Sequence, residues 1–96
     1  MSCKVVLESK IKPEVSEEIQ VFLEENLPNV RSYKGCKSVH VLLNDVTNEM
    51  IFYEDWKSKE DHQNYINFIN KNGVLEELSS FLETAPSIKY FEELII

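Results

Sequence analysis

The sequence predicts an α+β fold of the ferredoxin-like type, with the element order β-α-β-β-α-α-β and a four-stranded antiparallel sheet. Two observations predict this fold. Segments in which apolar and polar residues alternate are separated by segments in which apolar residues recur every three or four positions, as strands and helices require. The chain also has only two glycines and three prolines, and each falls between expected elements or at the start of one.

The first third of the chain predicts a strand followed by a helix. Cys3 to Ile11 alternates apolar and polar side chains, and Pro13 suits the first turn of a helix. From Glu14 to Leu27, apolar residues form one stripe at helical spacing, while glutamates cover the opposite face. Pro28 is expected to break this helix, and Val30 to Lys34 to form a loop or a last turn.

The middle of the chain predicts a β-hairpin. After Gly35, a strand is expected from Cys36 to Asn44, with His40 on the face opposite to Val39. A turn then leads into a third strand from Met50 to Trp56.

The last third predicts a broken helix and a final strand. Ser58 suits the N-cap of a helix, and Gly73 separates this helix from a shorter one that begins at Val74. Pro86 ends the second helix, and alternation from Ser87 to Ile95 predicts the fourth strand.

This element order also predicts how the chain buries its apolar surface. Right-handed crossovers place both helical layers on one face of the sheet. The other face then carries a second set of apolar side chains with nothing over it, and a second copy of the same sheet is the simplest cover. We therefore expect residues 1–96 to form a single domain that pairs as a homodimer through the open face of the sheet.

Charge and cysteine content exclude several classes of partner. Ten Lys and Arg against 17 Asp and Glu give a net charge of −7, which argues against nucleic acid and against anionic membranes. No apolar run approaches the roughly 20 residues of a membrane helix, and the N-terminus does not have the pattern of a signal peptide, so we expect a cytoplasmic protein. Cys3 and Cys36 form no metal or redox motif and are expected to be reduced. His40 and His62 lack a carboxylate at i+4, so no metal site is expected.

Four stretches carry a resemblance to a known family. They are R-S-Y-K-G-C-K-S-V-H-V over residues 31–41, F-Y-E-D-W-K-S over 52–58, D-H-Q-N-Y-I over 61–66 and P-S-I-K-Y-F over 86–91. With them, nearly the whole chain resembles the antibiotic biosynthesis monooxygenase-like domain, a dimeric α+β barrel. The resemblance implies a monooxygenase that needs neither metal nor flavin and no other cofactor, and that acts on a small aromatic or quinol-type compound.

The chain departs from the family at one informative position. Many small members place a histidine nine residues after the strand-three tryptophan, where this sequence has Tyr65. The haem-degrading branch has an asparagine on strand one, a tryptophan at the Tyr65 position and a histidine ten residues later. Here strand one has no asparagine and the last position is Leu75, so haem degradation is not expected.

The residue types and the resemblance together give the candidate site residues. The catalytic candidates are Tyr65, His40 and His62. The candidates for substrate binding are aromatic: Trp56, Tyr53, Phe68 and Tyr90. Each also has a structural interpretation, since His40 acts as a base only if it points into the pocket, and Trp56 can serve as a wedge between sheet and helix.

Two further points stay open at the level of sequence. Glu54 on the third strand is expected to form a buried ion pair across the dimer, with Arg31 or a lysine, rather than to act in catalysis. The chain can also be a non-catalytic dimeric module that binds a small apolar ligand, or an isomerase or lyase of a small metabolite.

Overall fold

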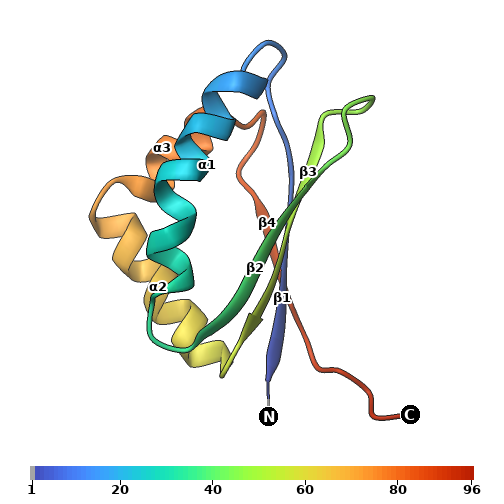
Figure 1. Cartoon of the computed structure of the whole chain (residues 1–96), viewed down its shortest axis with the longest axis vertical. Helices are drawn as coiled ribbons and strands as arrows, with labels where there is room; N and C mark the ends of the chain where they lie inside the picture. Colours follow the sequence, from blue (N-terminus) through green and yellow to red (C-terminus); the bar gives the residue numbers. More distant parts are fainter. Residues whose placement is uncertain (1) are drawn as a thin grey trace.

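The computed structural model describes residues 2–96 and confirms the predicted order of elements. The elements are β1 (Cys3–Lys10), α1 (Ser16–Arg31), β2 (Cys36–Leu43), β3 (Glu49–Trp56), α2 (Lys59–Lys71), α3 (Val74–Ser80) and β4 (Ser87–Phe91). All three helices lie on one side of the sheet (Figure 1). Among residues 2–96, no helix is long and apolar enough to cross a membrane.

The four strands form one antiparallel sheet in the order β2-β3-β1-β4. The central strand β1 pairs with β3 along its whole length, from Cys3 opposite Trp56 to Lys10 opposite Glu49. On its other side, β1 pairs with β4 only over Lys4 to Glu8. This is the predicted ferredoxin-like arrangement, and it makes β2 and β4 the edges of the sheet.

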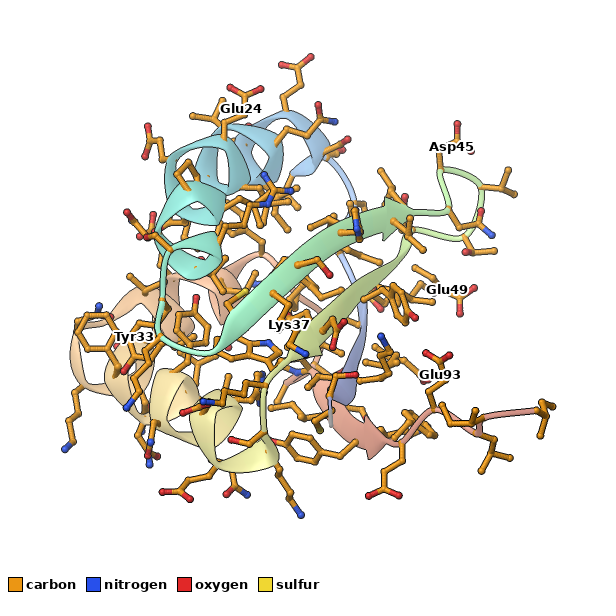
Figure 2. The ribbon with its side chains drawn as sticks, turned by 60° about the horizontal axis from the view of Figure 1, so that its bottom comes forward. Glu24, Tyr33, Lys37, Asp45, Glu49 and Glu93 are labelled. Atoms are coloured by element: carbon orange, nitrogen blue, oxygen red, sulfur yellow. The ribbon has the colours of Figure 1, made fainter. Side chains whose placement is uncertain are left out.

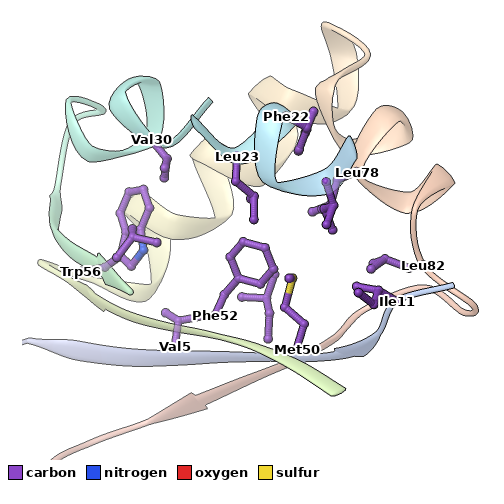
Figure 3. Packing of buried hydrophobic residues seen from close by; sticks show 13 residues of the cluster. Val5, Ile11, Phe22, Leu23, Val30, Met50, Phe52, Trp56, Leu78 and Leu82 are labelled. Carbon is purple, nitrogen blue, oxygen red and sulfur yellow. The ribbon is translucent and has the colours of Figure 1, made fainter. Parts of the chain in front are cut away.

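The core lies between the sheet and the helices (Figure 3). Because side chains alternate along a strand, Met50, Phe52 and Trp56 of β3 all point toward the helices and are buried. From the helical side, Phe22 and Leu23 of α1 close over them. The same alternation places Glu54 on this inner face.

The first helix is longer than the sequence predicts. It runs through Pro28 to Arg31, although proline lacks the amide hydrogen of the helical ladder and costs about 3 kcal/mol inside a helix. Val30 in the last turn is 5% exposed and belongs to the core, and Arg31 Nη2 donates a hydrogen bond to the Val39 carbonyl at 2.9 Å. These contacts of the last turn with the core and with β2 outweigh the local preference to stop at Leu27.

The last strand is shorter than predicted. It ends at Phe91 rather than Ile95: Phe91 lies opposite Lys4, and β1 begins one residue earlier at Cys3, so β1 could pair with Glu92 at most and not with residues 93–95. Beyond it, the chain runs away from the body of the molecule (Figure 1), and Leu94 is 77% exposed.

The break between the second and third helices follows the prediction. The Ser58 side chain accepts a hydrogen bond from the Asp61 amide at 3.1 Å and caps α2. Gly73 has a φ of 88°, a left-handed conformation that favours glycine, and α3 begins at the next residue.

Candidate functional site

A cavity of about 50 Å³ lies between the sheet and the helices. Apolar side chains from β1, β2, β3 and all three helices form most of its wall. Its polar lining comes from Glu54, His62, Tyr65 and Asn26. Side chains thus fill most of the space between the layers, and a small hollow with a few polar groups remains.

Glu54 is a buried carboxylate on this wall. Its position on β3, between Phe52 and Trp56 on the same face, leaves it 4% exposed. The Trp56 indole Nε1 donates a hydrogen bond to Glu54 Oε1 at 2.7 Å. Burial raises the pKa of the Glu54 carboxyl to about 7, and the hydrogen bond from Trp56 opposes this shift only in part. At neutral pH the carboxyl therefore lies near the midpoint of its titration.

His62 lies against Glu54 at the start of α2. Its side chain is fully buried, and Nε2 lies 3.6 Å from Glu54 Oε1, beyond hydrogen-bond distance. The other ring nitrogen, Nδ1, shares a hydrogen bond with Tyr90 Oη at 2.8 Å. Burial lowers the pKa of the imidazole to about 4, so His62 is neutral at neutral pH.

Tyr65 stands at the edge of the cavity, one helical turn after His62. Its ring packs against Tyr33 and Trp56, with centroids 5.2 and 5.4 Å away. Burial, followed by the nearby Glu54, raises the pKa of the Tyr65 phenol above its ordinary range. Tyr65 is therefore an un-ionised phenol at neutral pH, which suits a hydrogen-bond donor and not a base.

A wider groove lies on the outer side of Tyr65. It has a volume of about 320 Å³ between the end of α1 and α2, and it shares Tyr65, Asn26, Ile69 and Val74 with the cavity. Tyr33, in the loop between α1 and β2, reaches across to α2 (Figure 2), where its ring lies 5.5 Å from that of Phe68. Tyr65 therefore separates an open aromatic groove from the buried cavity.

Not all of the predicted site residues meet at this cavity. Tyr65 and His62 line it, and Trp56 lies fully buried beside them. Phe68, half exposed, lines the groove, and Tyr90 contacts His62 from β4.

His40 and Tyr53 lie elsewhere. They face each other across β2 and β3 on the outer side of the sheet, and Tyr53 is 44% exposed. The alternation that buries Val39 turns the neighbouring His40 outward, so His40 does not reach this cavity within the protomer.

Within residues 2–96, Glu54 does not form the expected ion pair with Arg31 or a lysine. The Arg31 guanidinium donates a hydrogen bond to the Val39 carbonyl. Glu54 accepts a hydrogen bond from Trp56, and His62 Nε2 lies 3.6 Å from its Oε1. Glu54 also points toward the helices, away from the open face of the sheet where a second protomer would pack. Its role at the cavity could have been inferred from sequence, because its spacing places it on the same face as Phe52 and Trp56.

Neither cysteine has a disulfide partner in the structure. Both Cys3 and Cys36 are free and partly buried, and burial raises the pKa of the Cys36 thiol to about 11. Within residues 2–96, no group of three or more His, Cys, Asp or Glu side chains is placed to hold a metal ion.

Several solved structures share this fold. A conserved protein from Methanosarcina mazei Go1 superposes with a TM-score of 0.85 at 18% identity, covering 98% of this chain and 94% of that protein. Rv0793 from Mycobacterium tuberculosis gives a TM-score of 0.82 at 12% identity, with 100% and 98% covered. The monooxygenase from the gene ActVA-Orf6 of Streptomyces coelicolor, solved with the ligand nanaomycin D, gives 0.78 at 16% identity, with 99% and 91% covered.

Sequence comparison gives the family. No curated protein matches this sequence significantly. Residues 3–67 match the family profile described as antibiotic biosynthesis monooxygenase. This stretch is more than half of the chain and contains the first three strands together with Glu54, His62 and Tyr65. The chain therefore belongs to the antibiotic biosynthesis monooxygenase family.

Proposed function

We propose that this protein is a cofactor-independent monooxygenase that acts on a single-ring quinol-type compound, with Glu54 as its base. The observation that carries the proposal is the buried Glu54 carboxyl, with a pKa of about 7, on the wall of an apolar cavity. A general base works best when its pKa lies near the operating pH.

The proposed reaction requires from the protein a base, an apolar cavity and one hydrogen-bond donor. Glu54 removes a hydroxyl proton, and the resulting electron-rich anion reduces dioxygen itself. One oxygen atom enters the ring, the other leaves as water, and the quinol is oxidised to a hydroxyquinone, so the substrate supplies all four electrons that reduce dioxygen. The apolar wall excludes water from the intermediate, and the Tyr65 hydroxyl donates a hydrogen bond to the developing oxyanion.

The size of the cavity restricts the substrate. About 50 Å³ is less than the roughly 150 Å³ of a cavity that holds benzene, so even one ring requires side chains to move. The outer groove, at about 320 Å³, falls within the range of ligand sites. We propose that the substrate first stacks between Tyr33 and Phe68, and then enters when Tyr65 swings outward. The proposed substrate is therefore a single ring and not a polycyclic anthrone.

The open face of the sheet supports a homodimer. Leu42, Tyr53 and Phe91 expose roughly half of their surface there, and Val6 and Ile51 lie between them on the outward positions of β1 and β3. Such an apolar face is costly to leave in water. We propose that the same face of a second copy covers it, which places His40 and Tyr53 at the interface.

Oxygen consumption tests the function. We expect uptake with a panel of single-ring quinols, unchanged by a chelator, and at least a 100-fold lower kcat in Glu54→Gln. Glu49→Gln is the matched control, because Glu49 is an exposed residue of the same strand. Failure of every quinol to consume oxygen would overturn the proposal. Tight binding without turnover would favour the binding module, and a product of the same mass as the substrate would favour an isomerase.

A further inference from the structure

Three polar side chains connect the cavity to the opposite edge of the molecule. Glu54 of β3 lines the cavity, His62 Nε2 lies 3.6 Å from its Oε1, and His62 Nδ1 is hydrogen bonded to Tyr90 Oη of β4 at 2.8 Å. In the sheet, β4 lies on the far side of β1 from β3. The three residues therefore cross from the centre of the sheet to its edge.

The outer end of this row meets solvent. Tyr90 is partly buried and lines a surface hollow together with Cys3, Lys57 and Lys59. The Lys59 Nζ lies 4.9 Å from the centroid of the Tyr90 ring. This hollow shares no residue with the groove on the other side of Tyr65, so the two ends of the site open at different places.

His62 lacks one of the hydrogen bonds that a buried structural histidine normally makes. Its Nε2 atom is buried and has no hydrogen-bond partner within the described residues 2–96. An orphaned buried polar atom costs about 1–3 kcal/mol, so its retention calls for an explanation. Glu54 Oε1 lies 3.6 Å from this atom, and neutral imidazole can accept a proton on one nitrogen while it donates from the other.

We propose that His62 and Tyr90 form a proton relay through which the buried Glu54 exchanges its proton with solvent. The inference rests on the proposed role of Glu54 as base. A substrate in the cavity and the groove would cut Glu54 off from water on the groove side. The relay gives the carboxyl a second route, so Glu54 can be ionised when the substrate is already bound.

The transfer is balanced in protons and moves no electrons. The Glu54 hydroxyl donates its proton to His62 Nε2, Nδ1–H passes to Tyr90 Oη, and the phenolic proton of Tyr90 leaves to water. The reverse sequence loads Glu54. One proton therefore enters and one leaves, and neither His62 nor Tyr90 needs to carry a lasting charge.

The phenols and thiols around this row keep their protons at neutral pH. Burial raises the pKa values of Tyr65 on α2, Cys36 on β2 and Cys3 on β1. Burial, followed by the nearby Cys3 and Glu54, also raises the pKa of Tyr90. Lys59 supplies a positive charge beside Tyr90, and Glu92 and Asp55 lie near Cys3 at the same edge. None of these groups lies between Glu54 and His62.

Nitrogen-15 NMR of His62 tests the relay without requiring activity. A working relay needs both tautomers, so both ring nitrogens of the wild type should resonate between the values of a bare and a protonated nitrogen. Tyr90→Phe removes the Nδ1 partner and should separate the two resonances fully, as one tautomer remains. Tyr53→Phe, on the outer face of the sheet, should leave the His62 resonances unchanged. A wild type with one fixed tautomer, unaltered in Tyr90→Phe, would overturn the relay.

Kinetics then separates the relay from the proposed function. With a quinol that the wild type oxidises, Tyr90→Phe and His62→Gln should lower kcat at least ten-fold with little change in KM, and should move the acidic limb of the pH profile. Unchanged kcat and pH profile in both variants would refute the relay and leave the monooxygenase proposal standing. Tautomer exchange that depends on Tyr90, with no quinol oxidised, would refute the monooxygenase and support the relay.

Discussion

Trp56 holds Glu54 from two residues away on the same strand, through an indole N–H donated to the carboxylate at 2.7 Å. The pair is unusual because a carboxylate 4% exposed normally has a cation beside it. In the described part of the chain, its one possible cationic partner is His62, whose lowered pKa leaves it neutral. The core therefore contains a carboxyl group whose ionisation is unfavourable in the folded state. The free energy of unfolding should depend on pH as a result.

Glu54→Gln should stabilise the protein at neutral and higher pH. In the folded state, burial raises the pKa of Glu54 from 4.5 to about 7, so folding favours the protonated form. Wild-type stability therefore falls, relative to the variant, as pH rises from about 4.5 to about 7. Above pH 7 the difference should be about 3 kcal/mol, since one pKa unit corresponds to about 1.4 kcal/mol. Urea unfolding at pH 4, 6 and 8 measures it.

The exposed Glu49→Gln serves as control and should shift the unfolding free energy by less than about 0.5 kcal/mol at every pH. His62 contributes the opposite slope between about pH 4 and 6.5, because its pKa is lowered in the folded state. That slope is present in both proteins, so it largely cancels in their difference. A constant difference between wild type and Glu54→Gln across pH 4–8 would contradict the buried, raised carboxyl.

Tyr65→Phe should distinguish the contribution of the Tyr65 hydroxyl to turnover from the contribution of its ring to packing. The ring packs against Tyr33 and Trp56, and phenylalanine keeps that packing, so the thermal unfolding midpoint should stay within a few degrees. Turnover of a quinol that the wild type oxidises should fall at least ten-fold, with little change in KM, because in the proposed mechanism the Tyr65 hydroxyl donates a hydrogen bond to the oxyanion. Unchanged turnover would remove the Tyr65 hydroxyl from the site and leave the ring as a gate.

The two glycines, Gly35 before β2 and Gly73 before α3, provide a matched pair of substitutions. Both have left-handed backbones, with φ of 90° at Gly35 and 88° at Gly73. A Cβ at Gly35 would lie 2.5 Å from Asp61 Oδ2, whereas a Cβ at Gly73 would meet nothing within 4 Å. Gly73→Ala should therefore cost only the backbone strain, about 1 kcal/mol.

Gly35→Ala should cost more than Gly73→Ala, because the strain is joined by a clash with Asp61. Combining Gly35→Ala with Asp61→Gly should restore most of the additional loss in urea unfolding. Equal costs for Gly35→Ala and Gly73→Ala would show that the Asp61 side chain moves away freely.

The sequence predicts the elements of this fold well where one local signal dominates. Strand alternation places Phe52 and Trp56 correctly, and Ser58 and Gly73 mark helix ends through their own chemistry. The errors at Pro28 and at the end of β4 have another cause. Tertiary packing of Val30 carries a helix through a proline, and the register of β4 against β1 limits how far β4 can extend.

The candidate site is less accessible to sequence analysis, because it depends on pairs of residues far apart in the chain. The pattern places His62 on the apolar stripe of its helix, and the spacing of Glu54 from Phe52 and Trp56 puts it on the same face of its strand. Neither feature shows that Glu54 and His62 lie 3.6 Å apart. The sequence pattern also does not show the hydrogen bond between His62 and Tyr90, which lies 28 positions later. The face occupied by His40 depends on the register of β2 against β3, and the tertiary structure supplies it.

The open face of the sheet gives the last prediction, on oligomeric state. At micromolar concentration, light scattering should give a mass of about twice 11.2 kDa. Ile51→Glu places a charge between Leu42 and Glu8 on this face, so it should produce a monomer, or protein that aggregates or unfolds, since folding and pairing are linked. Val21→Glu, at a position 55% exposed on α1, adds the same charge on the helical side and should leave the dimer intact. A wild-type monomer that stays folded at these concentrations would show that this sheet face tolerates water and would contradict the homodimer.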